Sequence, residues 1–145
     1  MIYAEYLVLA FLGSIAPAIA INIEKRLLFW AGLGGMLGVL VVLLIKPSVD
    51  SFSISQIFAG SLAVGLYSEL MAKVLRAPST VFLIPGIFPL VPGITAYKTI
   101  EAFAGNEVSK AALLGIDTFA KSFTIAFGIM LVTAVFRFIR KKRMS

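Results

Sequence analysis

The sequence contains no cysteine and no histidine, and it is poor in charge, since only 14% of its 145 residues are charged. The absence of cysteine excludes a disulfide framework, a thiolate metal site and a cysteine nucleophile. The absence of histidine removes the commonest metal ligand and acid–base group. No catalytic or metal-binding residues are predicted, no cofactor is expected, and enzyme chemistry has little support.

Hydrophobic residues dominate instead, at 60% of the chain, and they form long runs with charges between them. The mean hydropathy is +1.02. A soluble domain of this length would expose a shell of charge because its surface outgrows its core. Runs of about 20 apolar residues match the roughly 30 Å hydrocarbon core of a bilayer. The composition therefore predicts an all-α integral membrane protein, with residues 1–145 forming a single transmembrane domain.

Segments between the charged residues predict about five transmembrane helices. The uncharged runs hold 18, 19, 18, 21 and 15 residues, at 6–23, 27–45, 51–68, 77–97 and 122–136. The last run reaches spanning length only if its helix also admits Lys121 and Asp117. The predicted spans are 3–23, 27–45, 54–76, 78–104 and 110–138, of which the fourth is discontinuous.

The basic residues predict the orientation, because Lys and Arg near span ends are retained in the cytoplasm. With five spans, nine of the 13 basic residues fall on one side, and Lys46, Lys98 and Lys110 fall on the other. The N-terminus is therefore expected outside and the C-terminus in the cytoplasm, in the cell membrane. The basic tail is interpreted as an anchor to anionic lipid headgroups and not as a nucleic-acid site, because it directly follows a span.

The fourth predicted span is interrupted, because residues 77–94 contain four of the six prolines. Proline lacks an N–H and clashes with the preceding turn, and glycine adopts backbone conformations open to few other residues. Transporters use the freed carbonyls and half-helix N-termini of such breaks to bind solutes. We therefore predict a substrate-binding or gating site at Pro85, Gly86, Pro89, Pro92 and Gly93. A kinked helix, or a tight extramembrane hairpin without a ligand, is the alternative.

Charged residues inside spans are costly and therefore functional candidates. Glu69 precedes Lys73 by four residues, which allows an ion pair on one helical face, whereas an unpaired Glu69 would suit proton coupling. Asp117 and Lys121 repeat this spacing. They would suit the ammonium and carboxylate groups of an amino acid, or would neutralise each other, or would contact a partner subunit. Tyr97, directly after the interrupted segment, is a further substrate-site candidate.

Gly34 and Gly38 form a Gly-x-x-x-Gly pair in the second predicted span. Such a pair allows another backbone to approach closely. Packing within the chain and a subunit interface, including one in a homo-oligomer, are both open interpretations.

The run Pro85-Gly86-Ile87-x-Pro89-Leu90-x-Pro92-Gly93, followed by Tyr97, resembles the signature of the threonine/serine exporter family. The resemblance is to the second, smaller half, which also occurs as a separate membrane subunit. It extends to Asn22 before Lys25-Arg26, to the glycine-rich second span, and to Glu69 before Arg76-Ala77-Pro78. It implies export of small polar metabolites such as threonine and serine, or of a dicarboxylate such as succinate, together with a larger partner subunit.

Two other functions remain open from the sequence. A non-transporting assembly subunit would hold the helices of a partner through the glycine faces, and conservative changes in the Pro-Gly segment would then spare function. A small-solute channel would show no coupling to a gradient. No nucleotide-binding fingerprint is present, so ATP is not expected to drive transport within this chain.

Overall fold

The computed structural model describes residues 2–45 and 52–144, and every regular element in these ranges is helical. In chain order the elements are α1 (Ile2–Ala20), α2 (Lys25–Ile45), α3 (Ile54–Leu75), α4 (Thr80–Ile87), the short 3-10 helix η1 (Phe88–Leu90), α5 (Gly93–Ala104) and α6 (Val108–Met144). The predicted all-α class is confirmed.

Four helices, α1, α2, α3 and α6, are each long and apolar enough to cross a membrane. The stretch from α4 through η1 forms a fifth candidate span together with α5, and the two parts are bent by 53°. A helical membrane protein of about five spans, with the fourth broken, is therefore confirmed. Lys46, one of the basic residues expected on the outer side, lies outside the described residues.

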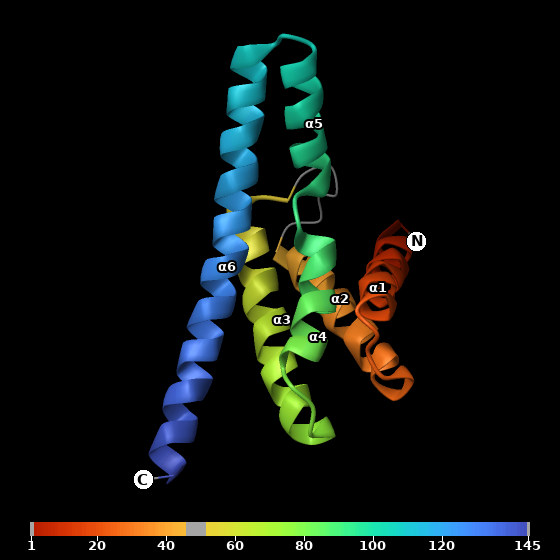
Figure 1. Ribbon diagram of the computed structural model, residues 1–145, viewed down its shortest axis with the longest axis vertical. Coiled ribbons are helices and arrows are strands. Elements are labelled where there is room, and N and C mark those ends of the chain that lie inside the picture. The colour runs from red at the N-terminus through yellow and green to blue at the C-terminus, as the bar shows by residue number, and fades with distance from the viewer. Residues whose placement is uncertain (1, 46–51, 145) are drawn as a thin grey trace.

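Helix α2 lies at the centre of a bundle with α1, α3 and α4 (Figure 1). The buried core joins apolar side chains from α2, α3 and η1, among them Val42, Val64 and Leu90. Because η1 supplies Leu90 to this core, one edge of the break in the fourth span is fixed by the packing of the whole bundle.

The glycines of α2 bring its neighbours close. A Cβ atom on Gly38 would lie 2.5 Å from Val64 Cγ2, and one on Gly34 would lie 3.2 Å from the Tyr67 ring. Both contacts are to α3 of the same chain. The Gly-x-x-x-Gly pair therefore serves packing within the chain, the first of the two interpretations that the sequence left open.

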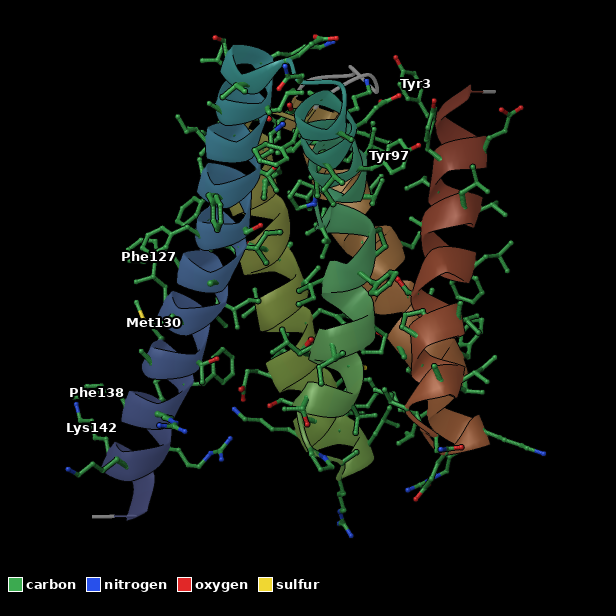
Figure 2. All side chains as sticks on the ribbon, turned by 45° about the horizontal axis from the view of Figure 1, so that its top comes forward. Tyr3, Tyr97, Phe127, Met130, Phe138 and Lys142 are labelled. Atoms are coloured by element: carbon green, nitrogen blue, oxygen red, sulfur yellow. The ribbon has the colours of Figure 1, made fainter. Side chains whose placement is uncertain are left out.

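Helices α5 and α6 form a hairpin that extends beyond the bundle (Figure 1). With 37 residues, α6 is about 55 Å long at roughly 1.5 Å per residue, which exceeds the hydrocarbon core of about 30 Å. Large apolar side chains are exposed along both helices, including Ile94, Phe103, Leu113 and Phe119. On α6, Met130 and Phe138 project away from the bundle (Figure 2), whereas Phe127 stacks on Phe58 of α3. This hairpin thus has an uncovered apolar surface.

The turn between α1 and α2, the turn between α3 and α4, and the C-terminus lie at the same end of the molecule (Figure 1). Basic residues gather there, from Lys25 and Arg26 to Arg76 and the end of α6. This distribution is the one on which the predicted orientation rests, and the orientation itself stays a prediction.

Candidate functional site

The backbone of the fourth span breaks between residues 88 and 92 and not at the first Pro-Gly pair. Helix α4 continues through Pro85 and Gly86 and ends at Ile87. After η1, Val91 is extended, with φ −62° and ψ 130°, and α5 starts at Gly93. Pro92 thus directly precedes the first turn of α5.

The prediction that glycine supplies an unusual backbone at this break is wrong. None of the described glycines has a positive φ. Gly86 is needed for its small size, because a Cβ atom there would lie 2.7 Å from Val64 Cγ1. Gly93 is different, since a Cβ atom on it would meet nothing within 4 Å.

A cavity of about 280 Å³ lies beside the break. Its walls come from η1 and the residues after it, from the first turns of α5, from α6, and from the start of α3. The lining residues are Phe52, Ile57, Pro89, Leu90, Val91, Pro92, Gly93, Ile94, Thr95, Lys98, Leu114, Asp117 and Lys121. The site therefore joins interrupted backbone to charged side chains of two helices.

Asp117 and Lys121 form the charged wall on α6. Lys121 Nζ donates a hydrogen bond of 2.6 Å to Asp117 Oδ2. The Lys121 side chain is only 6% exposed, whereas that of Asp117 is 41% exposed. The pairing at this spacing is one of the predicted alternatives. It holds a buried ammonium group beside a carboxylate that a solute can reach.

Lys98 and Thr95 line the cavity from α5. The first backbone N–H groups of a helix have no partner within the helix and carry partial positive charge. Because Gly93, Ile94 and Thr95 also line the cavity, this end of α5 lies at its wall. Two lysines, one aspartate and the N-terminus of α5 thus line one cavity, an arrangement suited to a small solute that carries a carboxylate.

The sequence reasoning missed Lys98 and Thr95 as site residues, because Lys98 was counted only as a charge outside the membrane. The spacing of Thr95 and Lys98 could have indicated that both side chains lie on one face of the helix. Residues three apart lie on one face of a helix, and both belong to the first turns after the break. A polar face that immediately follows a broken segment is therefore a sequence signal for residues that line the cavity.

Only some of the predicted site residues line the cavity. Pro89, Pro92, Gly93, Asp117 and Lys121 line the cavity. Pro85 and Gly86 are instead buried in α4.

Two further candidates also lie away from the cavity. Tyr97 is 67% exposed and lies on the side of α5 that faces away from α6 (Figure 2). Glu69 lies in α3 and is held by the far end of α6, so it belongs to a different part of the molecule.

Glu69 does not form the ion pair with Lys73 that its spacing allowed. Its carboxylate Oε2 lies 3.6 Å from Arg140 Nη2, and Lys73 Nζ lies 4.6 Å from the centre of the Phe136 ring. Both partners belong to α6, which packs closely along α3. The Glu69 side chain is only 9% exposed. Tertiary packing of α6 against α3 has replaced the local pair.

A helical bundle with one broken span beside a charged cavity has the architecture that secondary transporters use for solute sites. The family described as threonine/serine exporter, ThrE, matches residues 6–135, so the chain belongs to this family of membrane transport proteins. No match is found among curated proteins or among solved structures.

Proposed function

We propose that the chain is the smaller subunit of a secondary transporter that exports small polar metabolites, and that the cavity at the break is its solute site. The observation that carries this proposal is the convergence of Lys98, Asp117 and Lys121 on the interrupted backbone in one cavity of about 280 Å³. A cavity of this size accommodates a solute of the size of serine, threonine or succinate.

The charges favour an amino acid as the solute. Its carboxylate would meet Lys98 and the N-terminus of α5, and its ammonium group would meet Asp117, whose carboxylate is accessible. A dicarboxylate such as succinate would gain from both lysines but would be repelled by Asp117. Threonine and serine are therefore the proposed solutes, and a dicarboxylate is the second candidate.

We further propose that Glu69 takes part in coupling transport to a proton gradient. Its side chain is buried, and its partner Arg140 is 62% exposed and 3.6 Å away. Such a pair is weak because solvent screens the exposed partner. The carboxylate is therefore not locked in this pair and stays available for a role in transport.

A larger partner subunit of the same exporter type would cover the α5–α6 hairpin. The exposed apolar side chains of Ile94 and Phe103 on α5 and of Leu113 on α6 support this part of the proposal. Alternatively, a second copy of this chain would cover the hairpin in a homo-oligomer. Membrane lipid would contact the remaining apolar faces. We place the complex in the cell membrane, with the N-terminus outside and the C-terminus in the cytoplasm. No nucleic-acid partner is proposed.

The decisive experiment is efflux of labelled serine, threonine and succinate from proteoliposomes that contain the chain alone or with its larger partner. Gly93 lines the cavity, and Gly93→Leu adds a large side chain there without displacing the core, because nothing lies within 4 Å of its Cβ position. Gly13→Leu is the matched control, since its Cβ position on α1 is equally open.

We expect Gly93→Leu to abolish efflux and Gly13→Leu to retain it, with both variants still assembled. Equal efflux in the two variants would exclude the cavity as the solute site. If neither arrangement transports any solute, the chain is an assembly subunit. Efflux that an uncoupler leaves unchanged would identify a channel.

A further inference from the structure

A second cavity, of about 340 Å³, lies at the opposite end of the bundle from the α5–α6 turn. Its walls are the turn between α1 and α2 and the turn between α3 and α4. Both turns lie at the same end as the C-terminus of α6 (Figure 1). This is the end where the basic residues gather, so it lies at the level of the lipid headgroups if the protein spans the bilayer.

Two arginines line this cavity, Arg26 from the first turn of α2 and Arg76 from the end of α3. Glu24 also lines it, and its carboxylate accepts a hydrogen bond from Arg26 Nε. That bond uses one of the five N–H donors of the guanidinium group. The three side chains together carry a net charge of +1, and arginine binds phosphate through paired N–H donors.

The backbone holds Arg76 firmly at this position. Arg76 adopts the left-handed conformation, with φ 51° and ψ 46°, and its backbone N–H donates to the carbonyl of Ala72. The chain then turns at Pro78 into α4, whose first residues Thr80 and Val81 also line the cavity. The arginine thus stands beside the start of a helix, where partial positive charge favours an anion.

Most of the remaining wall of the cavity is apolar, and Asn22 and Thr80 are its polar residues. Leu27, Val81 and Ile84 contribute to the apolar part, and Ile84 is also exposed on the surface of α4. An inorganic anion gains nothing from such a wall. A ligand with a phosphate at one end and a hydrocarbon chain at the other would satisfy both the arginines and the apolar side chains.

We propose that this cavity binds the phosphate headgroup of an anionic phospholipid from the adjacent leaflet, with an acyl chain along α4. The lipid would bridge the two turns that form the cavity and so tie α1 and α2 to α4. This inference does not depend on the proposed transport function, because it concerns the other end of the molecule.

The test uses the full chain, delipidated in a neutral detergent, with binding measured by native mass spectrometry. The ligands are dioctanoyl phosphatidylglycerol, dioctanoylglycerol, which lacks the phosphate, and glycerol phosphate, which lacks the chains. The variants are Arg76→Asn, Arg76→Lys and the control Arg137→Gln on α6. Asparagine suits position 76 because it tolerates a positive φ better than most residues.

We expect one phosphatidylglycerol to bind to the wild type, to Arg76→Lys and to Arg137→Gln. In Arg76→Asn the apparent dissociation constant should rise about tenfold, the typical effect of losing a charge-assisted hydrogen bond. Equal binding by Arg76→Asn would overturn the proposal. So would glycerol phosphate or dioctanoylglycerol binding as tightly as phosphatidylglycerol, because the site would then bind a soluble anion or an apolar chain alone.

Discussion

Lys121 Nζ and Asp117 Oδ2 lie 2.6 Å apart on one face of α6, yet the lysine side chain is almost fully buried and the aspartate side chain is 41% exposed. The ammonium group is therefore fixed in the protein, while the carboxylate is open to the cavity. If the cavity is the proposed solute site, this asymmetry makes Asp117 the group that would distinguish one solute from another.

Asp117→Asn should change solute preference. Removing the carboxylate removes the proposed partner of an amino acid's ammonium group and the repulsion of a second carboxylate. Efflux of serine should fall about tenfold relative to that of succinate, the effect of one charge-assisted hydrogen bond. The measurement is the ratio of the two efflux rates in the same proteoliposomes. An unchanged ratio would show that Asp117 serves only to hold Lys121.

Lys98→Gln should reduce solute affinity without affecting stability. Lys98 lines the cavity and is exposed, so its replacement leaves no buried group unpaired. The half-saturating solute concentration should rise about tenfold. Lys110→Gln is the control, because Lys110 belongs to the same hairpin but pairs with Glu107 and does not line the cavity. Equal effects of the two substitutions would point to general electrostatics and not to a contact.

Replacing the glycine of each Pro-Gly pair with alanine should change the stability of the fold at Gly86 but not at Gly93. Gly86→Ala places a Cβ atom 2.7 Å from Val64 Cγ1, and Val64 is fully buried. Overpacking of this kind costs about 1 to 3 kcal/mol, which exceeds the gain in helix propensity of about 1 kcal/mol. Gly93→Ala meets nothing within 4 Å and should leave the melting temperature unchanged. A thermal melt of both variants in detergent checks this, and equal melting temperatures would contradict the packing argument.

Gly35 of α2 packs against Ser14 of α1. A Cβ atom on Gly35 would overlap Ser14 Oγ. Gly35→Ala should therefore destabilise the fold by about 1 to 3 kcal/mol. Adding Ser14→Gly removes the obstructing side chain and should recover most of this loss, less about 1 kcal/mol for glycine in a helix. Thermal melts of the single and double variants measure the recovery, and no recovery would mean that another contact limits the approach of the two helices.

Glu69→Gln should abolish the coupling of efflux to a proton gradient without reducing the stability of the fold. The ion pair with Arg140 contributes at most about 1 kcal/mol, because the arginine is largely exposed. The melting temperature should change little, while efflux should lose its response to an imposed proton gradient. Arg140→Gln is the companion variant, which removes the pair but keeps the carboxylate and so should retain the response. A gradient response in Glu69→Gln equal to that of the wild type would assign Glu69 to structure alone.

Much of the fold follows from local patterns. The spacing of charges predicts the spans, since a bilayer requires about 20 apolar residues between them. The prolines predict a break in the fourth span, and the spacing of Asp117 and Lys121 allows their pairing. Each of these features depends on residues within one helical turn or one span, and such features can be read from sequence.

The remainder depends on contacts between distant residues. Arg140 reaches Glu69 only because α6 packs along α3, and nothing in the local spacing of Glu69 shows this. The break lies after Ile87 because η1 is anchored in the core by Leu90, although proline first appears in the helix at Pro85. Lys98 joins the cavity through the bend that brings α5 to α6. These placements come from tertiary packing, which overrides local signals.

The two walls of the cavity at the break, η1 and α5, differ in how they pack against the rest of the protein. Leu90 belongs to the bundle core, whereas α5 packs mainly against α6. We therefore expect the amide hydrogen of Leu90 to exchange with solvent only when the bundle opens, and those of α5 to exchange through separation of the hairpin alone. Local opening of lower free energy is thus expected on the α5 side of the cavity. If the cavity is the proposed solute site, a solute would enter and leave on this side while the bundle core stays folded.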